Sequence, residues 1–117
     1  MNMKKTNIYL LSAFIDGIDM YKIGITKNEI SIRMRSLQTG NPYKIELINS
    51  FQSKWASKVE SYLHSYFKKN KVLNEWFLLS EEEVNLFSYL CQKTENIFEL
   101  LEQNNLFIQE KGGIKKI

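Results

Sequence analysis

Two apolar runs on either side of an Asp-Gly pair constrain the fold of this chain most strongly. The first run covers residues 8–15, the second covers residues 19–25, and Asp16-Gly17 lies between them. An Asp-Gly pair between runs of this kind is a strong short-range signal for a β-hairpin. The sequence therefore predicts that the chain begins with two antiparallel strands joined by a tight turn.

The length of that turn decides which side chains share a face of the hairpin. Because side chains alternate along a strand, loops of two or four residues both place Tyr9 on the same face as Lys22 and Gly24. The opposite face is the better hydrophobic core, since it carries Ile8, Leu10, Phe14, Tyr21, Ile23 and Ile25. We therefore expect Tyr9 and Lys22 to lie on the functional side of the hairpin.

The next segment predicts a short helix followed by a third strand. Thr26 and Glu29 match a capping box, which predicts a helix from about residue 27 to residue 38. Gly40 is well placed to end this helix. Residues 43–51 alternate in polarity and are expected to form the third strand.

The second half of the chain predicts two more helices. Ser53 can cap a helix whose apolar stripe contains Val59, Tyr62, Leu63, Tyr66 and Phe67. Residues 75–79 form a short extended piece, and Ser80 with Glu83 match a second capping box that starts a long helix.

These elements predict an α+β fold with a small three-stranded antiparallel sheet, flanking helices and an additional C-terminal helix. We expect one domain over residues 1–117, with a core at about 7–80, the last helix at about 81–108 and a frayed tail at 109–117. No apolar run is long enough to span a membrane, and no signal peptide is visible. A cytoplasmic location without membrane contact is therefore the expectation.

Charge is distributed unevenly along the chain. Residues 1–72 hold 12 Lys and Arg against 5 Asp and Glu, whereas residues 73–117 hold 4 against 8. This asymmetry suggests a basic working face and an acidic, solvated remainder. A basic face suits nucleic acid as a partner, but on charge alone lysines that only solubilise surface helices are the more common explanation. Cys91 is the single cysteine, so no internal disulfide can form. With His64 as the single histidine, the chain also has too few ligands for a Cys-His zinc site.

Glu60 is the carboxylate of the basic half that best suits a metal site. The others lie in the hairpin turn, in the predicted capping box or on the third strand, whereas Glu60 borders a buried helical stripe. Magnesium accepts such oxygen ligands and keeps several waters. From the spacing alone, a helix-surface residue paired with His64 or a lysine is the more common interpretation of Glu60. A lone His on a helix is itself most often structural.

Two arginines and a tyrosine are further candidates for a phosphate-handling site. Arg33 and Arg35 lie on the first predicted helix, and a guanidinium can bind phosphate bidentately. The spacing does not decide which of the two arginines faces the hairpin. Tyr9, taken alone, is more typical of a core aromatic whose hydroxyl reaches water.

Several short motifs together resemble the GIY-YIG nuclease superfamily. They are IYLL around Tyr9, KIGIT at 22–26, RMRSLQTGNP at 33–42, VESYLH at 59–64 and EWF at 75–77. Because the second motif begins with lysine, the chain resembles the phage and large-virus branch, that of the T5 phage orf-172-like domain. The resemblance covers about residues 7–80.

The resemblance implies a role for each matching residue. Tyr9 would position or deprotonate the attacking water, Arg33 would stabilise charge on the phosphate, and Glu60 would hold one divalent cation, Mg²⁺ or Mn²⁺. Lys22 would stand in place of the usual second tyrosine, and Gly24 would allow close backbone approach. The chain departs from the family at Asn7, where glycine is usual, and at Lys22 itself.

The expected function is thus a metal-dependent DNA endonuclease. Its catalytic candidates are Tyr9, Lys22, Arg33, Glu60 and His64, and its nucleic-acid contacts are Lys22, Lys27, Arg33, Arg35, Lys54 and Lys58. The alternative is a binding module on the same fold with little or no catalysis, directed at nucleic acid or at a protein. A homodimer or a protein partner is compatible with either interpretation.

Overall fold

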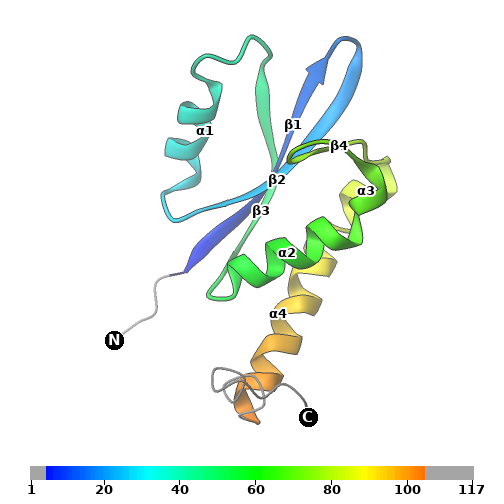
Figure 1. The fold of residues 1–117 in the computed structure, drawn as a ribbon. Coiled ribbons are helices and arrows are strands. Elements are labelled where there is room, and N and C mark those ends of the chain that lie inside the picture. Colours follow the sequence, from blue (N-terminus) through cyan, green and yellow to red (C-terminus); the bar gives the residue numbers. More distant parts are fainter. Residues whose placement is uncertain (1–4, 105–117) are drawn as a thin grey trace.

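The computed structural model describes residues 5–104 and confirms the α+β class (Figure 1). Its strands are β1 (Thr6–Ile15), β2 (Ile18–Thr26), β3 (Ile45–Ser53), β4 (Lys71–Leu73) and β5 (Trp76–Phe77). Its helices are α1 (Ile30–Gln38), α2 (Ala56–Tyr66), α3 (Glu81–Asn85) and α4 (Phe87–Gln103), with a 3-10 turn at Lys68–Asn70.

The sheet has five strands, so the prediction of three was wrong. Their order is β3–β1–β2–β5–β4, and every neighbouring pair is antiparallel. The two additional strands contain three and two residues. Segments that short carry no recognisable periodicity, which is why the sequence showed only an extended piece at this position.

The hairpin of β1 and β2 forms as predicted. Asp16 and Gly17 both have positive φ angles, 51° and 82°, and Ile15 pairs with Ile18. Two consecutive residues with positive φ define the tight turn that suits the twist of paired strands. Tyr9 consequently pairs with Gly24, and both lie on the face that carries Lys22.

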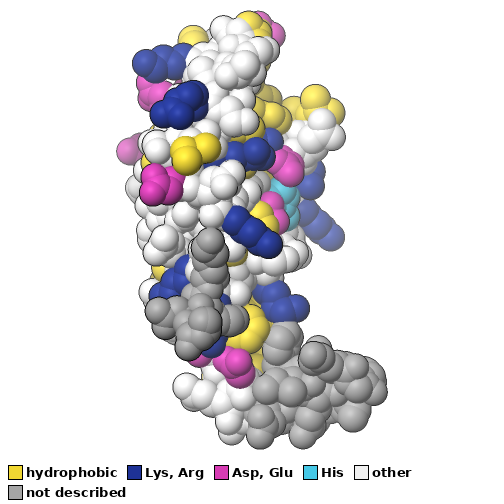
Figure 2. All heavy atoms as spheres, turned by 90° about the vertical axis from the view of Figure 1, so that its left-hand side faces the viewer, with side chains coloured by type: hydrophobic (Ala, Val, Ile, Leu, Met, Phe, Trp, Pro, Cys, Tyr) yellow, Lys and Arg dark blue, Asp and Glu magenta, His cyan; other side chains and the backbone are white. Residues whose placement is uncertain are grey.

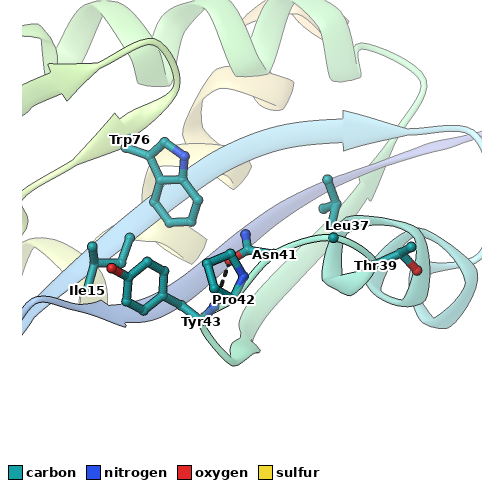
Figure 3. Close-up of a pocket in the computed structure, with 8 residues that line it drawn as sticks. Ile15, Leu37, Thr39, Asn41, Pro42, Tyr43 and Trp76 are labelled. Atoms are coloured by element: carbon teal, nitrogen blue, oxygen red, sulfur yellow. Dashed lines mark hydrogen bonds between the residues drawn. The ribbon is translucent and has the colours of Figure 1, made fainter.

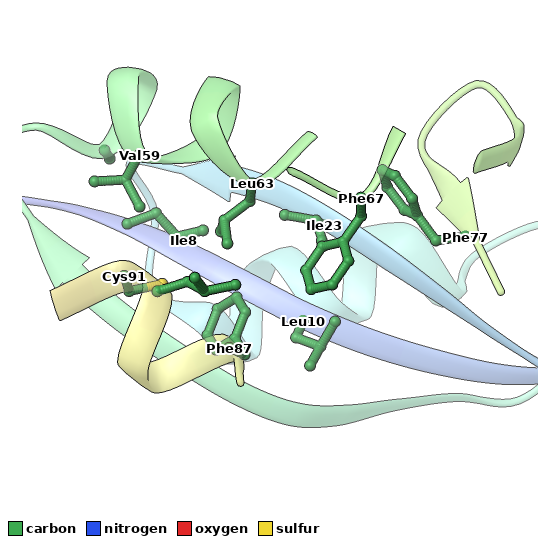
Figure 4. Packing of buried hydrophobic residues seen from close by; sticks show 11 residues of the cluster. Ile8, Leu10, Ile23, Val59, Leu63, Phe67, Phe77, Phe87 and Cys91 are labelled. Atoms are coloured by element: carbon green, nitrogen blue, oxygen red, sulfur yellow. The ribbon is translucent and has the colours of Figure 1, made fainter. Parts of the chain in front are cut away.

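Helices cover both faces of the sheet. α1 lies on one face, and α2, α3 and α4 lie on the other (Figure 1). The main core forms under α2 and α4, where Leu10, Ile23, Leu63, Phe77 and Phe87 are buried together (Figure 4). It is the face that the hairpin pattern predicted as the core.

The face of Tyr9, which we expected to be the functional side, is covered by α1. Tyr9, Leu11 and Ile45 form a second buried cluster, against which Ile30, Met34 and Leu37 of α1 are packed. A sheet with helices on both faces must be apolar on both. Tyr9 is only 1% exposed as a result.

The helix ends agree with the predicted capping signals in part. Ser80 and Glu83 form the predicted capping box. Thr26 does not, because its hydroxyl accepts the N–H of Asn28 at 3.1 Å, and α1 begins at Ile30 instead of residue 27. A short polar side chain that bonds to a neighbouring backbone group competes with helix formation.

The last predicted helix is divided in two. The N–H of Leu86 bonds to the carbonyl of Glu83 at 3.1 Å, so the turn tightens there and α3 ends before α4 begins. The predicted frayed tail and the final residues of this helix lie outside the described residues. Within residues 5–104 no helix combines the length and apolarity needed to cross a membrane.

Candidate active site

The side chain of Tyr9, on β1, extends over the neighbouring strand β2 at Gly24. The two residues are direct partners in the β1–β2 ladder. A Cβ atom added at Gly24 would lie 2.5 Å from the Tyr9 hydroxyl oxygen and 2.6 Å from Cζ. Only glycine therefore leaves room for the phenol ring, and this pair fixes the hydroxyl over β2.

Arg33 reaches the same hydroxyl from α1. Its Nε–H donates a hydrogen bond of 3.3 Å to the Tyr9 hydroxyl oxygen. Arg33 is partly exposed and forms no ion pair with any residue in the described part of the chain. Its positive charge is thus available to an anion such as a phosphate.

Lys22 points from the same face of β2 and is held by Glu75. Its Nζ lies 2.6 Å from the Glu75 carboxylate and 5.6 Å from the centre of the Trp76 ring. The Lys22 side chain is 15% exposed. Glu75 belongs to the turn between β4 and β5, and sequence reasoning quoted it in the EWF motif without giving it a role. The Lys22–Trp76 strand pairing, which brings Glu75 here, was not visible in the sequence.

Beyond Lys22 the outer edge of β2 has no strand partner among the described residues. β5 pairs only with Tyr21 and Lys22. At the next residue, a side chain occupies this edge in place of a strand: the His64 Nε2 lies 3.0 Å from the carbonyl oxygen of Ile23. A carbonyl oxygen only accepts hydrogen bonds, so the His64 ring donates from Nε2.

Glu60 lies one helical turn before His64 and approaches the same edge. A carboxylate oxygen of Glu60 is 3.8 Å from the His64 Nε2 atom. Burial raises the pKa of the Glu60 carboxyl above its ordinary value; His64 and Lys22 oppose this rise, and Glu75 adds to it. Glu60 also lines an open hollow of about 420 Å³ together with Ser61, His64, Lys71 and Glu75.

These groups flank residues 22–24 of β2 from both faces of the sheet. Tyr9, Arg33 and Lys22 come from the face that α1 covers, whereas Glu60 and His64 come from α2 on the other face. Figure 2 shows the histidine side chain, acidic side chains and Lys or Arg side chains gathered at one place on the surface.

Comparison with known proteins places the chain in a family. A family model described as the T5orf172 domain matches residues 7–89, which include all the side chains of this edge. The chain belongs to the T5orf172 domain family. This is a phage-associated family related to nuclease-like domains. Neither the curated proteins nor the solved structures contain a match.

The donor set of this T5orf172 domain fits a single hard cation. Among residues 5–104 there is no group of three or more His, Cys, Asp or Glu side chains that could hold a metal ion. Two carboxylates, Glu60 and Glu75, nevertheless line the same hollow. Magnesium commonly binds one or two carboxylates and completes its shell with water. A bound cation would also offset the burial of the Glu60 charge.

The remaining basic residues lie at different distances from this edge. Lys27 and Arg35 are exposed, before and within α1. Lys54 pairs with Glu99 and Glu102 of α4, and the Lys58 Nζ lies 5.8 Å from the centre of the Phe98 ring. Lys71, which the sequence did not single out, lines the hollow of Glu60.

Proposed function

We propose that this chain is a metal-dependent phosphodiester hydrolase of the GIY-YIG type, with DNA as its expected substrate. One observation carries the proposal: the Tyr9–Arg33 pair lies over Gly24 of β2, and two residues along the strand Lys22 pairs with Glu75, which lines the same hollow as Glu60. Such groups suit phosphodiester hydrolysis, in which water must be positioned and charge must be stabilised on the phosphate.

Tyr9 and Arg33 are the proposed water-positioning and phosphate-binding pair. The Tyr9 hydroxyl accepts the Arg33 Nε–H at 3.3 Å, which leaves the phenol its own proton to donate and a lone pair to accept a hydrogen bond. A water can be positioned there. The other guanidinium N–H groups of Arg33 can bind the phosphate oxygens bidentately.

Lys22 is the proposed second cation for the phosphate. It lies two residues from Gly24 on the same face, and therefore beside the Tyr9 hydroxyl. Glu75 holds its ammonium group at 2.6 Å. This ion pair limits the mobility of Lys22 and partly neutralises it, so Glu75 sets how strongly Lys22 attracts an anion.

Glu60, with Glu75 beside it, is the proposed holder of Mg²⁺ or Mn²⁺. When bound there, the cation would supply positive charge for the leaving oxygen. His64 acts as a positioning residue, because it bonds the backbone of β2 and contacts Glu60. Its ring also packs edge-on against Phe77 at 5.0 Å, which fixes the orientation of the imidazole.

Incubation with supercoiled plasmid and with single-stranded DNA, in Mg²⁺, in Mn²⁺ and in EDTA, tests the proposal. We expect cleavage only with metal, and loss of cleavage in Arg33→Ala and Glu60→Ala. Lys93→Ala on α4 and Glu46→Ala on β3 are the matched controls, since they remove one positive and one negative charge at exposed positions away from the site. Both control variants should cleave DNA at the wild-type rate. Circular dichroism of each variant separates loss of activity from loss of folding.

A binding module without catalysis is the second candidate, and two observations favour it. Lys22 replaces a tyrosine and is occupied by Glu75. Asn7, which replaces a glycine, donates a hydrogen bond of 3.5 Å to the carbonyl of Asn28 in the loop before α1. A salt-sensitive gel shift with no metal-dependent product would support this function and contradict the hydrolase.

A further inference from the structure

A second hollow lies beside the candidate active site, on the face of the sheet that α1 covers. It measures about 420 Å³, and its walls include Ile15, Leu37, Asn41, Pro42, Tyr43 and Trp76 (Figure 3). Tyr43 and Trp76 lie on opposite sides of it. No charged side chain lines it among the described residues.

The loop that forms one wall is held rigidly by Gln38. The Gln38 side-chain amide donates to the carbonyls of Asn41 at 3.3 Å and Tyr43 at 2.9 Å, and its oxygen accepts the N–H of Ile45 at 2.8 Å. The Asn41 side chain accepts the N–H of Tyr43 at 2.9 Å. The hollow is therefore largely preformed, as binding sites for small planar groups usually are.

The hydroxyl of Tyr43 adds a connection to the hairpin. It donates a hydrogen bond of 3.2 Å to the Asp16 carboxylate in the turn between β1 and β2. The aromatic ring is thereby held across the hollow from Trp76. The Asp16 carboxylate itself lies at the hairpin tip and does not line the hollow.

The hollow is adjacent to the proposed phosphate site. Trp76 pairs with Lys22, and the Lys22 Nζ lies 5.6 Å from the centre of the Trp76 ring. Lys22 and Gly24 are two residues apart on β2, and the Tyr9 hydroxyl lies over Gly24. Two residues of a strand span about 7 Å. A group stacked on Trp76 therefore lies next to a phosphate bound at Arg33 and Lys22.

We propose that this hollow binds an unpaired nucleobase, stacked on Trp76 with Tyr43 as the opposite wall. The substrate class is then single-stranded or branched DNA, since a base inside a duplex cannot leave its stack without cost. The lining supports this occupant: it contains two aromatic side chains and no charged one, and the Lys22 Nζ lies 5.6 Å from the centre of the Trp76 ring. Aromatic faces accept any base, so the preference is for an unpaired state and not for a sequence. This inference rests on the proposed function, because it takes the phosphate site of that function as its anchor.

Tryptophan fluorescence in EDTA provides the test. The chain has two tryptophans, so Trp55→Phe leaves Trp76 as the reporter, and Trp76→Phe leaves Trp55. The probes are a short oligothymidylate, an abasic oligomer of the same length and a blunt duplex. We expect the oligothymidylate to quench Trp76 and leave Trp55 unchanged, with the abasic oligomer and the duplex quenching neither.

Affinity from fluorescence anisotropy gives a second measurement. Trp76→Leu should weaken oligothymidylate binding about tenfold. Tyr89→Leu removes an aromatic that is 61% exposed on α4 and should leave the affinity unchanged. If Trp76→Leu fails to fold, quenching in Trp55→Phe still decides the matter, because that variant keeps the hollow intact.

The outcomes separate this inference from the proposed function. If the abasic oligomer binds as tightly as oligothymidylate and Trp76 is not quenched, the base site is refuted while the phosphate site stands. Binding of the duplex in preference to oligothymidylate also refutes the base site. If no nucleic acid binds at low salt and no plasmid is cleaved with metal, the proposed function itself fails, and the base site with it.

Discussion

Replacing Gly24 with alanine tests how the fold builds the candidate site. The backbone of Gly24 does not have a positive φ, so alanine is permitted there by conformation. Its Cβ would nevertheless lie 2.5, 2.6 and 2.9 Å from the hydroxyl oxygen, Cζ and Cε1 of Tyr9. The buried ring must therefore move, and the hydrogen bond to Arg33 must break with it.

The expected loss of stability follows from two opposing effects. Overpacking a buried site costs about 1–3 kcal/mol, and losing a hydrogen bond to a charged donor adds to that cost. Alanine in place of glycine within a strand gains about 0.5–1 kcal/mol, because the unfolded chain has less entropy to lose. We predict a net decrease of about 2 kcal/mol in the free energy of unfolding, or about 1 M in the urea midpoint.

A double-mutant cycle with Tyr9→Leu isolates the contact. Leucine lacks all three atoms that approach Gly24, so in that background Gly24→Ala should stabilise the fold by about 0.5–1 kcal/mol. The coupling energy should then be about 2.5–3 kcal/mol. Gly17→Ala is the matched control. No atom lies within 4 Å of its added Cβ, and its cost arises from a φ of 82°, so that cost should not depend on Tyr9.

Equal costs of Gly24→Ala in both backgrounds, within about 0.5 kcal/mol, would refute the reasoning. They would mean that the ring does not lie over Gly24. The position of the Tyr9 hydroxyl, and with it the proposed catalytic pair, would then be wrong.

Three further predictions follow from single contacts. Burial raises the pKa of the Cys91 thiol to about 12, so a thiol reagent should modify folded protein only as it unfolds. The pKa of a cysteine thiol in the unfolded chain is about 8.5. The buried, protonated Cys91 thiol therefore contributes fully to the free energy of unfolding below about pH 8.5, and this contribution should be lost as the pH rises toward 12. Urea unfolding of wild type and Cys91→Ala at several pH values measures the difference. Glu75→Gln releases Lys22, so filter binding in EDTA should show tighter DNA binding and a salt slope steeper by about one phosphate contact. An unchanged slope would mean that Lys22 does not reach the phosphate. Ser80→Ala removes the capping box of α3 and should cost about 1 kcal/mol in urea unfolding, whereas the exposed Ser65→Ala should change it by less than about 0.5 kcal/mol.

The sequence predicted the hairpin and the shared face of Tyr9 and Lys22 correctly because local chemistry determines both; it left two- and four-residue loops open, and the two-residue loop forms. Asp16-Gly17 accepts the positive φ angles that a two-residue turn requires. Strict alternation then places Tyr9, Lys22 and Gly24 on one face, whatever the rest of the chain does. The second capping box was predictable for the same reason, since Ser80 and Glu83 satisfy each other's backbone groups without any tertiary contact.

The errors arose where tertiary contacts decide. The burial of Tyr9 depends on α1 docking over it, and the hydrophobic pattern of the hairpin alone could not reveal a helix on that face. Glu75 reaches Lys22 only because two very short strands extend the sheet beyond β2. Such strands are too short for periodicity, so neither their pairing nor the resulting ion pair was predictable.

Cleavage of single-stranded DNA by Glu60→Ala is the most direct test of the central claim, with Glu46→Ala as its matched carboxylate control. The account predicts that wild type and Glu46→Ala cut with Mg²⁺ or Mn²⁺ and not with EDTA. The rate for folded Glu60→Ala should fall about a hundredfold or more, because the residue that holds the cation is gone. Cleavage by Glu60→Ala at the wild-type rate would contradict the account.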